Sequence, residues 1–229
     1  MSEIWMGLQE AVKLLISLDQ EVYRIILLSL YVSLTATAIA ALFGIPIGIL
    51  LGIAEFSYKR IVVRGLYTLM SLPPVIAGLV IFLLISRKGP LGFLGLTYTP
   101  AAMIIAQTCL ITPIIMGIVY NGTKEMGKTI RMIGKTLGAN AAQTMLLMIR
   151  ELRIHILTAI VTGYGRAVSE VGAVMIVGGN IRGHTRVMTT TIAMLQSMGD
   201  YAMAMAIGIV LLTLSFAINS ILYHFQQGA

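Results

Sequence analysis

Arg166 and Glu170 are two charged residues in a long apolar stretch. Residues 154–181 contain no other Asp, Glu, Lys or Arg. Opposite charges four residues apart lie on one face of an α-helix and can pair. Charged residues inside apolar helices usually pair with each other, but they also mark ion pathways. Two interpretations remain open. In the first, the two residues form an internal pair that stabilises the fold. In the second, Arg166 lines an anion pathway, and Glu170 lowers the affinity of that pathway for the anion.

A second group of polar residues lies between Gly178 and Thr191, where hydrogen-bond donors are plentiful and carboxylates are absent. Backbone amides of glycine-rich segments bind anions, and arginine pairs well with tetrahedral oxyanions. We expect a solvated loop that contacts another protein, with anion binding as the alternative. No second ligand lies near a histidine, so we expect no metal site. The donors are Asn180, Arg182, His184, Thr185, Arg186, Thr189, Thr190 and Thr191.

Residues 122–129 match the phosphate-binding pattern G-x-x-x-x-G-K-[ST] letter for letter. That pattern binds phosphate only where it forms a loop between a strand and a helix. Here the preceding residues 112–120 end a long uncharged run, and no apolar run ending in Asp follows to hold magnesium. We interpret the match as a coincidence and expect this chain to bind no nucleotide.

The segment 127–154 carries basic and small residues at helical spacing. Lys128, Arg131 and Lys135 recur at i, i+3 and i+7, which places them on one helical face. Small residues follow, and they would let a helix approach another protein closely. Spacing alone leaves open whether this helix docks on a protein or lies on anionic lipid. The small residues are Gly138, Ala139, Ala141 and Ala142.

Membrane-spanning helices must position these residues. The 229-residue chain is 58% hydrophobic and 11% charged, whereas soluble domains are about 25% charged. The lone cysteine, Cys109, excludes an intrachain disulfide framework. The net charge of +7 does not indicate nucleic-acid binding, because the charges cluster between apolar runs. Runs long enough to cross a bilayer predict an all-α polytopic fold with five spans, near 25–53, 65–86, 99–120, 156–177 and 201–223.

The distribution of Lys and Arg predicts the orientation. The side that holds residues 54–64, residues 121–155 and the C-terminus carries more of them, so it is the cytoplasmic side. The N-terminus is then outside. Residues 1–24 have neither a basic start nor a small-residue cleavage site, and we expect them to form an amphipathic segment at the outer surface.

Prolines and glycines predict where spans break and where they pack. We expect Pro46, Pro73-Pro74 and Pro113 to kink or break their helices, and Pro73-Pro74 to line a pore. A face of small residues recurs every fourth position on the first span and permits close helix packing. It consists of Gly44, Gly48 and Gly52.

The segment 127–154 resembles the EAA loop of permease subunits of binding-protein-dependent ABC importers, with Thr136-Leu137-Gly138-Ala139 at its glycine segment. Residues 71–92 and 169–186 are similar to conserved blocks of the molybdate, tungstate and sulfate permeases in that family. Within that group, the residues of these blocks are most similar to those of the tungstate permeases. This chain departs from the EAA motif at two places, with Met132-Ile133-Gly134 for Glu-Ala-Ala and Arg150-Glu151 for Leu-Pro.

The resemblance implies an ABC importer permease fold over about residues 25–225, with a cytoplasmic coupling loop at about 121–155. It implies a pore subunit that is not itself an enzyme and that works as a homodimer in the cell membrane. Its implied partners are a cytoplasmic ATPase, which binds ATP and Mg²⁺, and an external oxyanion-binding protein. The lipid bilayer is a further partner, and nucleic acid is not one. The expected substrate is tungstate, with molybdate or sulfate as alternatives.

These expectations assign roles to particular residues. Two rival classes remain. An ATPase-independent secondary transporter or channel predicts inverted repeats, and the sequence shows none. A membrane anchor or scaffold without transport is disfavoured by the prolines expected to break the spans. The expected ATPase-coupling residues are Thr136, Leu137, Gly138, Ala139 and Ala142. The expected pathway residues are Pro73, Pro74, Arg166, Ser169 and Glu170, and the outer-loop residues are Asn180, Arg182 and Arg186.

Overall fold

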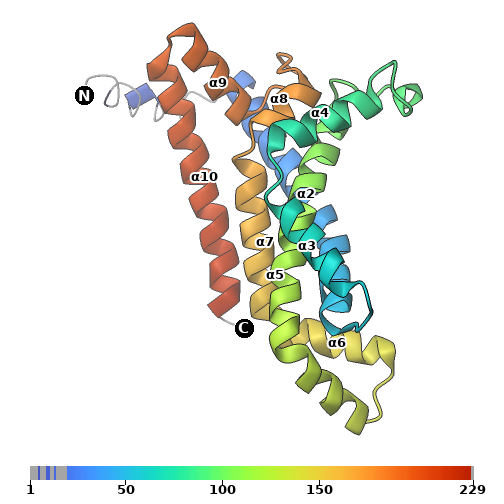
Figure 1. The fold of residues 1–229 in the computed structure, drawn as a ribbon. Coiled ribbons are helices and arrows are strands. Elements are labelled where there is room, and N and C mark those ends of the chain that lie inside the picture. The colour runs from blue at the N-terminus through green and yellow to red at the C-terminus, as the bar shows by residue number, and fades with distance from the viewer. Residues whose placement is uncertain (1–4, 6–8, 11–12, 14–19, 228–229) are drawn as a thin grey trace. The chain divides into compact units, whose positions relative to one another are not determined.

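The computed structural model describes residues 5, 9–10, 13 and 20–227, and Figure 1 labels their helices. Within these residues the chain is helical and contains no strand. The predicted amphipathic segment 1–24 lies largely outside the described residues. The chain divides into two compact units, described one at a time below. The first is Met1–Ala36, Pro73–Gln107 and Ala167–Asn219; the second is Thr37–Leu72, Thr108–Arg166 and Ser220–Ala229.

Among the described residues, three helices are long and apolar enough to cross a membrane, namely α2, α5 and the Tyr201–Ile221 part of α10. Two interrupted pairs, α3–α4 and α7–α8, raise the number of spans in the described residues to as many as five. The all-helical, multi-span prediction is confirmed. The elements are α2 Gln20–Ile53, α3 Lys59–Met70, α4 Pro74–Ile85, η1 Gly92–Leu94, α5 Pro100–Thr136, α6 Ala141–Glu151, α7 Arg153–Val168, α8 Gly172–Gly178, α9 Met188–Met198 and α10 Tyr201–Gln227.

Proline breaks one span and leaves two helices uninterrupted. The second predicted span stops before Pro73, which is extended (φ −61, ψ 128), and restarts with Pro74 in the first turn of α4. A residue that precedes proline avoids the helical conformation, and a first-turn proline lacks only an N–H that needs no partner there. Pro46 and Pro113 lie inside the unbroken helices α2 and α5, so neither proline breaks its helix, and a kink at either position stays a prediction.

The first unit is built from two packed groups of helices. α4 lies tightly against α8, because a Cβ at Gly78 would come within 2.6 Å of the Cα of Ala173. Elsewhere in this unit the start of α2, α9 and α10 share an apolar core. Ser29 on α2 accepts a hydrogen bond from the backbone N–H of Met188 at the start of α9 (2.8 Å). The core residues are Ile25, Ile26, Met188, Ala206, Ile207 and Val210.

In the second unit, the small-residue face of α2 packs directly against α5. A Cβ at Gly48 would lie 2.7 Å from the carbonyl oxygen of Met116, and one at Gly52 would lie 2.5 Å from Thr123. Gly44 is in similar contact with Ile115. The predicted close helix packing is confirmed, since any larger side chain would force the two helices apart.

Candidate functional site

The apparent phosphate-binding pattern is part of a helix. Residues 122–129 lie inside α5, which is helical from Pro100 to Thr136. Helical backbone N–H groups bond to carbonyl groups of the preceding turn, so they cannot cradle a phosphate there. Residues 122–129 therefore do not form a phosphate-binding loop between a strand and a helix. α5 also continues sixteen residues past the predicted end of its span at residue 120, because neither a proline nor a left-handed residue interrupts it before Gly138.

Gly138 ends α5 and turns the chain toward α6. Its backbone is left-handed (φ +73). The N–H of Gly138 donates to the carbonyl of Lys135 (3.0 Å), and the N–H of Ala139 donates to that of Gly134 (2.8 Å). This pair of bonds is the Schellman motif, which favours glycine at the left-handed position. Nothing lies within 4 Å of a Cβ placed at Gly138, so the turn requires glycine for its backbone conformation and not for lack of space.

Asn140 and Gln143 fix the start of α6. The side chain of Asn140 accepts a hydrogen bond from the N–H of Gln143 (2.9 Å), and the side chain of Gln143 accepts one from the N–H of Asn140 (2.9 Å). This reciprocal capping box stabilises a helix start. This capping box was not among the features predicted from the sequence, although the Asn-x-x-Gln spacing was the available signal. An acidic cap is therefore not needed to begin this helix.

The α5–α6 hairpin, residues 128–151, has a buried side and an exposed apolar side. Met148 and Leu152 are fully buried, and they anchor α6 to its unit. Leu137, at the tip of the hairpin, is 78% exposed. Of the other predicted coupling residues, Thr136 and Ala142 are exposed and Ala139 is half-buried. The exposed apolar side chains of the hairpin are Met132, Ile133, Leu137, Leu146 and Ile149.

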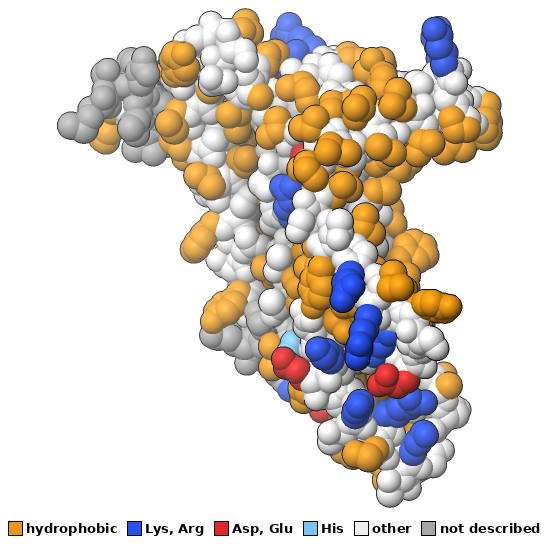
Figure 2. All heavy atoms as spheres, in the orientation of Figure 1, with side chains coloured by type: hydrophobic (Ala, Val, Ile, Leu, Met, Phe, Trp, Pro, Cys, Tyr) orange, Lys and Arg blue, Asp and Glu red, His pale blue; other side chains and the backbone are white. Residues whose placement is uncertain are grey.

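Positive charge surrounds the hairpin. Figure 2 shows Lys and Arg side chains gathered over α3, the end of α5 and α6. Arg131 and Lys135 line a hollow of about 290 Å³ between the end of α2 and the hairpin, together with Met145 and Met148. Lys128 lies 3.9 Å from Glu55, but both side chains are well exposed, so this pair contributes little stability. Exposed apolar and cationic groups together suit a docking surface for another protein.

The predicted pathway residues Arg166 and Glu170 do not share a helix. α7 ends at Val168, and Glu170 lies in the break before α8. The predicted position of both residues on one continuous helical face is therefore wrong, whereas their pairing stays a prediction. Glu170 is 4% exposed, and its carboxylate accepts a hydrogen bond from the N–H of Ala173 in the first turn of α8 (3.1 Å). A carboxylate at a helix N-terminus is favourable, so this hydrogen bond stabilises the start of α8.

Other polar side chains of the first unit hold this break in place. The hydroxyl of Thr189 donates to the carbonyl oxygen of Glu170 (2.9 Å), and the amide of Gln107 donates to that of Ala167 (2.9 Å). The Oε1 atom of Gln107 is buried and has no hydrogen-bond partner among the described residues. Ser169 is exposed. The pathway roles of Ser169, Pro73 and Pro74 stay predictions.

The segment after Gly178 is less solvated than predicted. Thr189, Thr190 and Thr191 are buried in α9, which begins at Met188, because their hydroxyls bond to groups within the unit. The Thr190 hydroxyl also lies within hydrogen-bond distance of Oδ1 of Asn180 (2.9 Å). The expectation of a solvated loop up to residue 191 is therefore wrong for these threonines.

Buried Thr185 fixes the shape of the remaining short segment. Its hydroxyl donates to the carbonyl of Gly178 (2.5 Å) and accepts from the N–H of Ile181 (3.0 Å). The N–H groups of residues 184–186 all donate to the carbonyl of Ile181. These bonds set the backbone positions from which Arg182 and Arg186 project.

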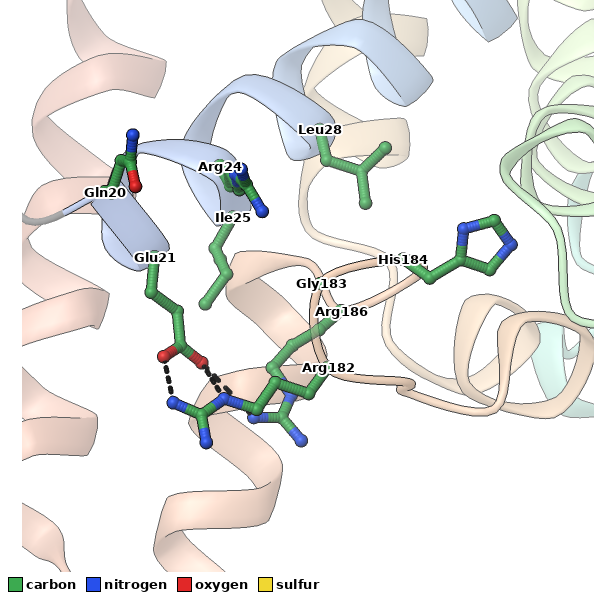
Figure 3. Close-up of a pocket in the computed structure, with 9 residues that line it drawn as sticks. All are labelled: Gln20, Glu21, Arg24, Ile25, Leu28, Arg182, Gly183, His184 and Arg186. Carbon is green, nitrogen blue, oxygen red and sulfur yellow. Dashed lines mark hydrogen bonds and ion pairs between the residues drawn. The ribbon is translucent and has the colours of Figure 1, made fainter.

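Arg182 and Arg186 meet the first turns of α2 at a pocket of about 580 Å³. Figure 3 shows Glu21 pointing at the two guanidinium groups, whereas His184 points away from them. Arg182 binds the carboxylate of Glu21 with two nitrogens, Nε at 2.7 Å from Oε1 and Nη2 on Oε2. Our sequence analysis named both arginines but not Glu21, because the partners are 161 residues apart.

Comparison with known proteins identifies the class. Residues 44–229 match the family described as the inner membrane component of binding-protein-dependent transport systems. The chain belongs to this family and is a multi-pass membrane permease. It is 57% identical to a tungstate uptake system permease protein of Peptoclostridium acidaminophilum, over 96% of this chain and 97% of the relative.

Two further relatives agree with this class. A tungstate uptake system permease protein of Campylobacter jejuni is 36% identical over 98% of this chain and 94% of its own length. A probable anion ABC transporter permease protein of Haloferax volcanii is 38% identical over 87% of this chain and 88% of its own length.

Proposed function

We propose that this chain is the pore subunit of an ATP-driven tungstate importer. The observation that carries the proposal is the 57% identity to a tungstate uptake permease over nearly the full length of both chains. Relatives at lower identity include molybdate/tungstate and sulfate transport permeases, so molybdate and sulfate are the alternative substrates.

Two copies of this chain assemble with two copies of a cytoplasmic ATPase. ATP and Mg²⁺ bind to the ATPase, while the α5–α6 hairpin presents its exposed apolar residues, with Leu137 at the tip, to that partner. The capped start of α6 and the Schellman turn at Gly138 support this role, because they hold the hairpin in one shape. A rigid hairpin transmits a movement of the ATPase to the spans, whereas a flexible one would absorb it.

The hairpin lies on the cytoplasmic side, and the N-terminus is outside. The support is the excess of Lys and Arg on the loops that include α3 and the end of α5. An external binding protein delivers the oxyanion to the opposite side. The helix breaks at residues 71–73 and 169–171 support a pathway role, because membrane spans tolerate non-helical backbone where it is buried in protein or lines a water-filled cavity.

Gentle purification of the tagged chain from its native membrane tests the proposed assembly. We expect a nucleotide-binding ATPase at one copy per permease chain. A variant with Gly138→Leu should reach the membrane but lose the ATPase. A permease recovered alone after cross-linking would contradict the proposal and favour a secondary transporter.

A further inference from the structure

The pocket between the start of α2 and residues 182–186 has an unbalanced charge. Three arginines line it, Arg24, Arg182 and Arg186, with Glu21 as the one carboxylate among its lining residues. His184 also lines the pocket, although its ring points away from the other groups (Figure 3). Like charges held close together repel unless an anion lies between them.

Glu21 provides that anion in part. Its carboxylate is bidentate on Arg182, but the nearest nitrogen of Arg186 is 3.9 Å away, which is beyond hydrogen-bond distance. Arg186 is 17% exposed, and its Nε has no hydrogen-bond partner among the described residues. The single planar carboxylate of Glu21 therefore forms hydrogen bonds with the guanidinium group of Arg182 but not with that of Arg186.

We propose that this arginine pocket binds a tetrahedral divalent oxyanion, and that Glu21 is the carboxylate which the anion displaces. A tetrahedral dianion has four acceptor oxygens in three dimensions, so it can accept from Arg182 and Arg186 together. Glu21 is 39% exposed and Arg182 is 73% exposed, so the carboxylate can rotate into solvent. Arg24, on the next turn of α2, adds attraction without a carboxylate partner in the described residues.

The pocket is preorganised for such an anion. Thr185 fixes the backbone between the two arginines through its bonds to Gly178 and Ile181. Ile25 and Leu28 form an apolar wall beside the charges, and low polarity strengthens nearby electrostatic interactions. Under the proposed orientation the pocket opens on the outer side. That the bound anion is the transported one rests on the proposed function.

Equilibrium dialysis of the full-length permease, purified in lipid-free detergent without any binding protein, tests the pocket directly. Sodium tungstate is the probe, with sulfate and phosphate as competitors, and bound tungsten is counted by mass spectrometry. We expect one tungstate per chain, at least tenfold weaker binding in R182A and in R186A, and at least twofold tighter binding in E21Q. Lys88→Ala is the matched control, since it removes an exposed cation that does not line the pocket.

Several outcomes would overturn the proposal. Absence of tungstate binding by the wild type would do so, as would binding that R182A, R186A and K88A affect equally. If R182A instead weakens only the capture of the external binding protein, the arginines form a protein contact. If anionic phosphatidylglycerol in nanodiscs abolishes tungstate binding, the pocket takes a lipid phosphate.

The conservative variant Arg182→Lys separates a binding role from a structural one. Lysine keeps the charge but lacks the bidentate fork, so tungstate binding should weaken while the thermal midpoint stays unchanged.

An uptake assay on the wild type keeps the two proposals distinct. Uptake with no binding to the pocket would overturn the pocket alone, and binding without ATP-dependent uptake would overturn the importer alone.

Discussion

The α5–α6 hairpin and the arginine pocket are built in opposite ways. Gly138 and Asn140 shape the hairpin through bonds to residues three to five positions away in the sequence. The pocket depends on Glu21 and Arg182, which are 161 residues apart and meet only in the folded unit. Local bonds give a part with a fixed shape, which suits the transmission of force. An exposed long-range ion pair can open, which suits the exchange of ligands.

The largest expected effect is at the hairpin turn. Gly138→Leu forces a left-handed conformation on a branched side chain, at a cost of roughly 1–2 kcal/mol, and it adds bulk at the docking surface. We expect tungstate uptake to fall by about tenfold or more, equivalent to about 1.4 kcal/mol of coupling, with normal amounts of protein in the membrane.

Gly199→Leu is the matched control for that variant. Gly199 is also left-handed (φ +81), has open space around it and ends α9 with the same pair of backbone bonds. It lies outside the hairpin, so uptake should persist at close to the wild-type rate. Equal losses in both variants would mean that backbone strain, and not docking, determines the result.

The next largest effect is expected where a buried hydroxyl supports the pocket. Thr185→Val leaves the N–H of Ile181 and the carbonyl of Gly178 without their partner, which costs about 1–3 kcal/mol. The thermal midpoint should fall by roughly 2–4 °C per kcal/mol for a chain of this size. Thr213→Val makes the same change at an exposed site on α10 and should leave the midpoint unchanged. An unchanged midpoint in T185V would show that the segment does not need this bond.

A smaller effect is expected at the start of α6. Asn140→Ala removes half of the capping box and should destabilise the helix by about 1 kcal/mol. Uptake should decrease a few-fold, and Asn140→Asp should restore it because Asp also caps helices. Normal uptake in N140A would show that the hairpin works even when the start of α6 unwinds. That result would contradict the proposal that the hairpin must be rigid.

The smallest effect is expected for the ion pair of the pocket. A double-mutant cycle of E21Q and R182Q, measured by thermal unfolding, should give a coupling energy of about 0.2–1 kcal/mol, as for exposed pairs. A coupling above about 2 kcal/mol would mean that Glu21 is a fixed structural partner, and the contrast between the two regions would disappear.

The same contrast explains which structural features could be predicted from the sequence. The apolar runs predicted the spans, and the small-residue face of Gly44, Gly48 and Gly52 predicted the packing of α2 on α5. The glycine segment located the hairpin, and the Asn-x-x-Gln spacing would have located its cap. All of these signals are local or periodic, so one sequence contains them.

Tertiary contacts decided the features that the sequence could not predict. Arg166 and Glu170 were expected on one helix, but α7 ends at Val168, and Glu170 accepts a hydrogen bond from the start of α8. The donor-rich segment was expected to be solvated, yet Thr185 is fully buried. Neither spacing nor composition shows which distant carbonyl or carboxylate a polar side chain will meet.

The measurement that tests the central claim most directly is tungstate accumulation by reconstituted vesicles that contain the permease, its ATPase and its external binding protein. We predict accumulation against a concentration gradient with hydrolysable ATP on the ATPase side, none with a non-hydrolysable analogue, and accumulation lowered about tenfold or more with Gly138→Leu. Accumulation by the permease alone, driven by an ion gradient and indifferent to ATP, would contradict the account.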